Sequence, residues 1–111
     1  MINLLICDDN PKITKQVSEL IVIFEKKYKI NFLIDIKHSG DFVLNNNKSY
    51  DIAIVDIEMP GISGLRLSEK LKELNSDIIV IVLTSFQNYL DSAMKIHVFR
   101  YLSKPLDKNR F

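Results

Sequence analysis

The fold is decided by one segment, Tyr50-Asp51-Ile52-Ala53-Ile54-Val55-Asp56, which continues into Ile57-Glu58-Met59-Pro60-Gly61. The four apolar residues Ile52–Val55 are typical of a buried strand. The Pro and Gly residues that follow Asp56 predict a loop leading into a helix. In an open parallel sheet, ligands bind at the carboxyl ends of the strands. The sequence therefore places the Asp56 carboxylate where a functional site is expected.

Composition indicates one soluble domain spanning residues 1–111, because a chain of 111 residues can bury a single core. The hydrophobic fraction of 47% and the charged fraction of 26% are ordinary for globular proteins. A net charge of +1 indicates neither nucleic acid nor membrane as a partner. The single cysteine, Cys7, lies in an apolar run and is expected in the core. Without a disulfide partner or an apolar run of about 20 residues, the chain is expected in the cytoplasm.

Apolar runs and helical patterns alternate along the chain. The predicted strands are Ile2–Cys7, Asn31–Ile36, Asp51–Val55, Ile78–Leu83 and Val98–Leu102. The predicted helices begin at Pro11 after an Asn10 cap, near Ser39, at Ser63 or Gly64, and after Asn88, and Asp107–Phe111 is expected to start one more. This alternation predicts an α/β fold with a parallel sheet covered on both faces by helices.

Apolar spacing predicts which side of each helix faces the core. The expected inward residues are Ile13, Val17, Leu20, Ile21, Phe24 and Tyr28 in the first helix, Leu65 or Leu67 with Leu71 and Leu74 in the third, and Leu90, Ala93 and Met94 in the fourth. Val22 and Ile23 lie off the stripe of the first helix, so we expect another segment to cover them. The six consecutive apolar residues Ile78–Leu83 predict a strand buried on both faces.

Polar groups follow four of the five predicted strands. Asp8 and Asp9 follow the first, Asp56 the third, Thr84 the fourth and Lys104 the fifth. Each of these residues alone would be an ordinary turn, cap or surface residue. Parallel strands bring their carboxyl ends to the same edge, so together these residues predict one site.

The chemistry of this site follows from its charges. Three clustered carboxylates repel one another unless a cation joins them, and hard oxygen ligands suit Mg²⁺. A carboxylate beside Mg²⁺ and a lysine is set up as a nucleophile toward phosphorus. The metal, the Lys104 ammonium and the Thr84 hydroxyl would stabilise charge on the transferring phosphoryl group. The predicted reaction is formation of an aspartyl phosphate on Asp56.

These motifs resemble the receiver domain of bacterial two-component response regulators over the whole chain. The resemblance rests on Asp8-Asp9, on Asp56 with Met59-Pro60-Gly61 and Gly64, on Thr84, and on Lys104-Pro105. It implies a doubly wound, flavodoxin-like sheet of five strands in the order 2-1-3-4-5. It also implies a sensor histidine kinase as the phosphoryl donor.

The resemblance further implies roles for individual residues. Asp56 would accept the phosphoryl group, and Lys104 would pair with it. Asp9, Asp56 and the backbone carbonyl of Glu58 would bind Mg²⁺ directly, while Asp8 would act through water. Thr84 and Tyr101 would form a switch pair, in which the hydroxyl moves to the phosphoryl oxygen and the ring turns inward.

The segment from Phe86 to Lys104 resembles receivers of regulators that carry a LytTR-type DNA-binding domain. The grounds are Tyr89-Leu90, Ala93-Met94 and the run from Phe99 to Pro105. Against the family pattern, the last helix is expected to be truncated and the effector domain to be absent. DNA binding would then belong to a longer protein, and a homodimer would be one way to bury the exposed face of the first helix.

Several alternatives remain open at this point. A phosphatase of the haloacid dehalogenase type also uses a strand-end aspartate, but it needs an acidic partner in a D-x-D pattern where this chain has Glu58. A receiver-like module that works without phosphate is a further reading, against which the complete acidic set argues. The Glu58 side chain either influences water attack on the acyl phosphate or is a solvated loop residue. Phe86 either gates the site or packs on the following helix.

Overall fold

A computed structural model describes residues 1–45, 48–85 and 90–104. Their strands form a parallel sheet in the order β2-β1-β3-β4-β5, which confirms the predicted topology. The strands are β1 (Ile2–Cys7), β2 (Phe32–Lys37), β3 (Ile52–Val55), β4 (Ile79–Thr84) and β5 (Arg100–Ser103). The helices are α1 (Pro11–Tyr28), α2 (Gly40–Asn45), α3 (Gly64–Leu74) and α4 (Leu90–Lys95).

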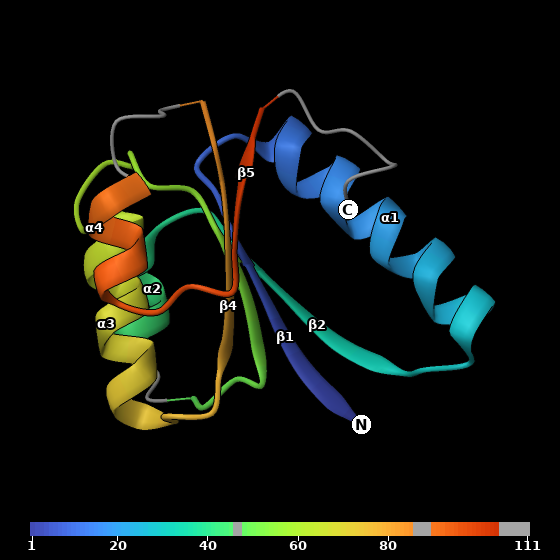
Figure 1. Cartoon of the computed structure of the whole chain (residues 1–111). Coiled ribbons are helices and arrows are strands. Elements are labelled where there is room, and N and C mark those ends of the chain that lie inside the picture. The colour runs from blue at the N-terminus through green and yellow to red at the C-terminus, as the bar shows by residue number, and fades with distance from the viewer. Residues whose placement is uncertain (46–47, 86–89, 105–111) are drawn as a thin grey trace.

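The sheet has a helical layer on each face. α1 lies on one face, whereas α2, α3 and α4 lie on the other (Figure 1). The α1 face is built around Leu4, Ile6, Val17, Ile21 and Ile54. The opposite face has a larger cluster that includes Leu5, Val55, Leu67, Leu71 and Val80. Alternate residues of each strand therefore supply the two cores, as the two-residue period of a strand requires.

Local sequence signals fix the ends of the long helices. The Asn10 side chain accepts a hydrogen bond from the Lys12 amide at 3.0 Å, and Pro11 is the first residue of α1, as predicted. α1 ends where Lys29 adopts a left-handed conformation with φ 55°. Ser63 caps the start of α3 by accepting from the Arg66 amide at 3.2 Å, and Asn75 follows its last residue.

Several side chains predicted to face the core are exposed. In α4, Leu90 is 47% and Met94 is 60% exposed, and Ala93 alone among the described side chains of this short helix enters the core. Leu74, at the end of α3, is also exposed. Phe24 and Tyr28 pack on each other with ring centroids 4.5 Å apart, and both are more exposed than the predicted stripe requires.

The α1 face of β4 is more open than predicted. The strand begins at Ile79 rather than at Ile78, and Ile79 is 39% exposed although burial on both faces was expected. The α1 side chains Ile21 and Phe24 reach this part of the sheet but leave space over it. A groove of about 130 Å³ remains there, lined by Leu4, Ile21, Phe24, Phe32, Ile52, Ile54 and Ile81. Val22 and Ile23 lie off the apolar stripe of α1 and are exposed, so the described part of the chain does not supply the segment expected to cover them.

The bounds of β5 also differ from the prediction. The strand runs from Arg100 to Ser103, because the Val98 amide instead closes the turn after α4 by bonding the Ala93 carbonyl at 3.3 Å. No helix in the described part of the chain is both long and apolar enough to cross a membrane. The predictions for Phe86 and for a helical turn at Asp107–Phe111 lie outside the described residues.

Candidate functional site

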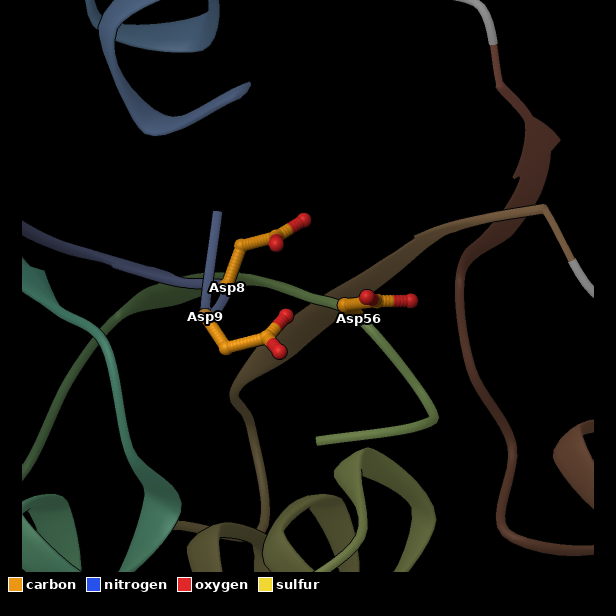
Figure 2. Close-up of side chains that lie close together, drawn as sticks. All are labelled: Asp8, Asp9 and Asp56. Atoms are coloured by element: carbon orange, nitrogen blue, oxygen red, sulfur yellow. The ribbon is translucent and has the colours of Figure 1, made fainter. Parts of the chain in front are cut away.

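The acidic residues meet because β1 and β3 are neighbours in the sheet. Cys7 pairs with Val55 in the parallel register, and the Asp56 amide donates to the Cys7 carbonyl at 3.0 Å. The residues that follow these strand ends are Asp8 and Asp56, so they emerge side by side. Figure 2 shows Asp8, Asp9 and Asp56 together at the carboxyl edge of the sheet. The sequence prediction that these carboxylates converge is confirmed in the structure.

The three carboxylates are close enough to share a cation. One oxygen from each of Asp8, Asp9 and Asp56 lies within 4.8 Å of the others. Oxygen ligands on opposite sides of an octahedral Mg²⁺ are about 4.2 Å apart, twice the metal–oxygen distance. Asp8 and Asp56 are 3% and 5% exposed, whereas Asp9 is open to solvent. The donor atoms and their spacing therefore fit a small, hard divalent cation that keeps some of its water.

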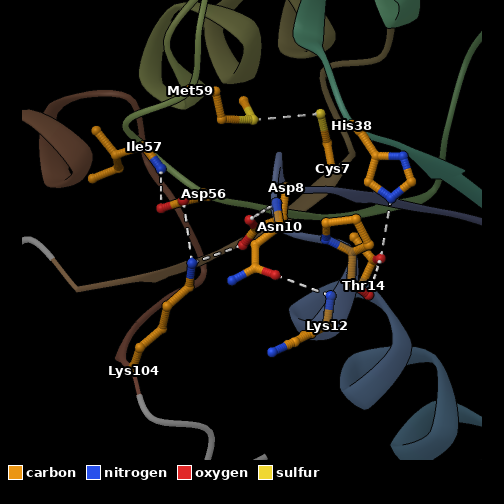
Figure 3. Close-up of polar contacts among 11 residues, drawn as sticks. Cys7, Asp8, Asn10, Lys12, Thr14, His38, Asp56, Ile57, Met59 and Lys104 are labelled. Atoms are coloured by element: carbon orange, nitrogen blue, oxygen red, sulfur yellow. Dashed lines mark hydrogen bonds and ion pairs between the residues drawn. The ribbon is translucent and has the colours of Figure 1, made fainter.

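Lys104 supplies a positive charge to the same site. Its Nζ lies 2.8 Å from Asp8 Oδ2 and 3.2 Å from Asp56 Oδ2 (Figure 3). β5 positions this lysine, because Ser103 pairs with Thr84 and the Lys104 amide donates to the Thr84 carbonyl at 2.9 Å. Three ionised carboxylates and one ammonium leave a net charge of −2. The residual charge matches that of a divalent cation.

For both Asp8 and Lys104, burial shifts the pKa in one direction and their mutual attraction shifts it in the other. Burial raises the pKa of Asp8 above its ordinary value, although hydrogen bonds from Lys104 and from the Asn10 amide lower it in part. Burial alone would lower the pKa of Lys104, but its hydrogen bond and attraction to Asp8, followed by those to Asp56, leave that pKa raised. The lysine therefore stays protonated, and the Asp8 carboxylate carries its charge at a cost.

The backbone after β3 holds Asp56 in place. The Ile57 amide donates to Asp56 Oδ1 at 2.8 Å, which leaves Oδ2 toward Lys104. The chain then loops back, and the Gly64 amide donates to the Ile57 carbonyl at 2.7 Å. A Cβ at Gly64 would lie 1.8 Å from the Asp56 carbonyl oxygen, so only glycine permits α3 to begin this close to the site.

The other predicted site residues lie near this centre. Thr84 is fully buried at the carboxyl end of β4. Tyr101 is half-buried and packs against the core cluster on the α3 face. Glu58 is exposed in the loop two residues after Asp56. Their roles as switch residues and as a carbonyl ligand remain predictions.

Two features of the site add to the sequence prediction. Lys104 was expected at the same site as the carboxylates and in a pair with a phosphoryl group, and the structure adds that its Nζ pairs directly with Asp8 and Asp56. β5 is separated from the acidic strands by β4, so this pairing depends on the reach of the lysine side chain across the edge of the sheet. The second feature is a buried hydrogen bond from Cys7 Sγ to Met59 Sδ, 3.8 Å long. Burial, followed by the charge of Asp8, raises the pKa of Cys7 to about 12, so its thiol keeps the proton that it donates.

Comparison with known proteins agrees with this geometry. The family model described as the response regulator receiver domain matches residues 4–111. The sensory transduction protein LytT of Oceanobacillus iheyensis is 32% identical over 97 residues, which cover 84% of this chain and 39% of LytT. The transcriptional regulatory protein BtsR of Escherichia coli is 32% identical over 111 residues, covering 99% of this chain and 45% of BtsR. The chain thus spans less than half the length of these two relatives.

Solved structures share the fold. The BeF3-activated DrrB receiver domain superposes with a TM-score of 0.86 at 21% identity, covering 99% of this chain and 90% of that one. The response regulator TrrA of Thermotoga maritima superposes with a TM-score of 0.72 at 28% identity, covering 99% of this chain and 92% of TrrA. The phosphatase alternative finds no support, since the receiver model accounts for nearly all residues. The chain belongs to the response regulator receiver family and is a receiver domain of a two-component response regulator.

Proposed function

We propose that this receiver accepts a phosphoryl group on Asp56 from a sensor histidine kinase, with Mg²⁺ bound at the acidic site. The observation that carries the proposal is the placement of the buried Asp56 carboxylate beside Asp8, Asp9 and the Lys104 ammonium. A structural ion pair would need only one carboxylate for one lysine. The surplus of negative charge instead suits a divalent cation, which together with Lys104 would offset the negative charge of an incoming phosphoryl group.

Asp9, Asp56 and the backbone carbonyl of Glu58 would hold Mg²⁺ directly, and Asp8 would hold it through water. The exposure of Asp9 and Glu58 leaves room for the water ligands that Mg²⁺ usually keeps. The related TrrA structure is described as a complex with Mg²⁺ and BeF, which supports this choice of metal. When bound, the metal would neutralise charge on the phosphoryl oxygens.

The residues of the chain perform the transfer itself. An oxygen of the Asp56 carboxylate forms a bond to phosphorus, while the bond between phosphorus and the donor breaks and its electron pair leaves with the donor. The hydrogen bond from the Ile57 amide fixes the rotation of the carboxylate. Lys104 then pairs with a phosphoryl oxygen, and the Thr84 hydroxyl donates to another. Asp56 stays phosphorylated until the acyl phosphate hydrolyses and regenerates the carboxylate. The domain is therefore a switch that assists its own phosphorylation and dephosphorylation, and not a turnover enzyme.

Phosphorylation would change the surface through Thr84 and Tyr101. Movement of the Thr84 hydroxyl toward the phosphoryl group would free space into which the Tyr101 ring turns, and two packings of similar free energy would allow the switch. The output would be transcriptional control by a DNA-binding domain in a longer cytoplasmic protein, of which residues 1–111 are the receiver. A homodimer of receivers would be one form of the activated state.

Intact mass spectrometry after incubation with Mg²⁺ and acetyl phosphate tests the proposal. We expect one labile phosphoryl adduct on the wild-type chain and none on Asp56→Asn. Asp77→Asn is the matched control, because it makes the same chemical change at an exposed position near the amino end of β4. The absence of an adduct on the folded wild-type chain, or its persistence in Asp56→Asn, would contradict the assignment of Asp56.

A further inference from the structure

Met59 is a buried residue in an otherwise exposed part of the loop after β3. Its side chain is 9% exposed, whereas the neighbouring Glu58 and Pro60 are exposed. Its Sδ accepts the hydrogen bond from Cys7 Sγ at 3.8 Å (Figure 3). Both side chains belong to the core cluster on the α3 face of the sheet. The loop is thus attached to the end of β1 through the packing of Met59 on Cys7.

This contact joins the two backbone segments that carry the candidate metal ligands. Cys7 is the last residue of β1, so Asp8 and Asp9 follow it directly. Met59 follows Glu58, whose carbonyl is the proposed backbone ligand. The packing of Met59 on Cys7 therefore links the backbone next to that carbonyl to the backbone next to the carboxylates that follow β1.

The contact between Met59 and Cys7 holds the loop in place through side-chain packing rather than through the strength of its hydrogen bond. A thiol is a weak donor and a thioether a weak acceptor, so the bond itself contributes little. Protein cores are close-packed, so a buried side chain that is shortened allows its backbone to shift. Mg²⁺ tolerates such shifts poorly, because it requires near-ideal octahedral geometry. Groups that orient metal ligands typically change metal affinity by about 10- to 100-fold.

We propose that Met59, packed on Cys7, is a positioning residue for the divalent-cation site. It sets the Glu58 backbone carbonyl at the correct place relative to Asp9 and Asp56 without touching the cation. This inference rests on the Mg²⁺ site proposed above.

The test is a Mg²⁺ titration of the full chain without a phosphodonor, followed through amide signals in NMR spectra. Met59→Ala should bind Mg²⁺ about tenfold more weakly than the wild type. Met59→Leu nearly restores the side-chain volume, so its affinity should stay within about threefold of the wild type. Cys7→Ala removes only the sulfur and should weaken binding by about threefold, at the low end of such effects.

Val98→Ala is the matched control for general loosening of the core. Val98 belongs to the same cluster and is also 9% exposed, but it precedes β5 at the opposite edge of the sheet. This variant should be less stable in thermal unfolding and yet bind Mg²⁺ with wild-type affinity. An equal loss of affinity in Val98→Ala would overturn the inference.

Wild-type affinity in both Met59→Ala and Cys7→Ala would also overturn it, while leaving the proposed function intact. If Met59→Ala does not fold, Cys7→Ala decides the question. A wild-type chain that binds no Mg²⁺ would overturn the proposed metal site and this inference together.

Discussion

Lys104 is the cation that the chain itself provides to its acidic site. It lies within 3.2 Å of both Asp8 and Asp56, and it is held at the end of β5 by backbone bonding to β4. Without a phosphoryl group, its ammonium offsets part of the repulsion between carboxylates. In the proposed phosphorylated state, the same ammonium would pair with a phosphoryl oxygen. Lys104 would then exchange a carboxylate partner for a phosphoryl partner.

Substitution of Lys104 should separate metal binding from the response. Lys104→Met keeps most of the length of the side chain but makes the net charge of the site more negative, from −2 to −3. We expect Mg²⁺ affinity to be unchanged or higher, because attraction to the carboxylates is stronger. The spectral change on adding beryllofluoride should be lost. Calorimetric Mg²⁺ titration and NMR spectra measure the two effects, and an intact beryllofluoride response would show that Lys104 is dispensable.

At the scale of elements, α3 is attached directly to the site through Gly64. The first residue of α3 lies against the Asp56 carbonyl, and its amide bonds the Ile57 carbonyl, so the start of the helix is held directly by the backbone at Asp56. A shift of Asp56 would therefore be passed to α3, and distortion of the first turn of α3 would displace Asp56.

Gly64→Ala should destabilise the fold by about 1–3 kcal/mol, because the new Cβ meets backbone atoms that cannot rotate away. Gly40→Ala, in α2, is the control. Its Cβ would meet Ile62 Cγ2, a side-chain atom that can move, so the cost should be smaller. Urea unfolding monitored by circular dichroism measures both. Equal stability of Gly64→Ala and the wild type would show that this close contact is not required.

For the whole molecule, burial of the Asp8 charge costs stability. The raised pKa of Asp8 means that the folded state holds this proton more tightly than the unfolded chain does. Its contribution to stability is fully present below the unfolded pKa and is lost as pH rises through the folded value. The pKa of Lys104 is also raised, so its stabilising contribution is fully present below its ordinary pKa of 10.5 and is lost as pH rises through the higher folded value.

Asp8→Asn should therefore raise the melting temperature of the metal-free protein at neutral pH. The gain should shrink as pH falls, because wild-type Asp8 then becomes protonated and loses its unfavourable charge. Mg²⁺ should stabilise the wild type more than the variant, since binding to the folded state adds to stability. Thermal unfolding from pH 4 to pH 8, with and without Mg²⁺, measures these differences. A lower melting temperature of Asp8→Asn than of the wild type at neutral pH would contradict the prediction that the buried Asp8 charge destabilises the fold.

The sequence by itself determined the elements, their order and the members of the acidic site. Strand runs such as Ile52–Val55 and caps such as Asn10 and Ser63 are local signals, because strand and helix periodicities and capping bonds involve residues close in sequence. The parallel topology follows from alternating strands and helices. It then requires Asp8 and Asp56 to meet at one edge.

Only the tertiary structure decided which side chains are covered and which polar groups pair. Leu90 and Met94 have the spacing of core residues, but their burial depends on what packs against α4, and only Ala93 reaches the core. The pairing of Lys104 with Asp8 and the contact of Met59 with Cys7 join residues far apart in the chain. Such contacts depend on distances across the folded sheet, which no local periodicity specifies.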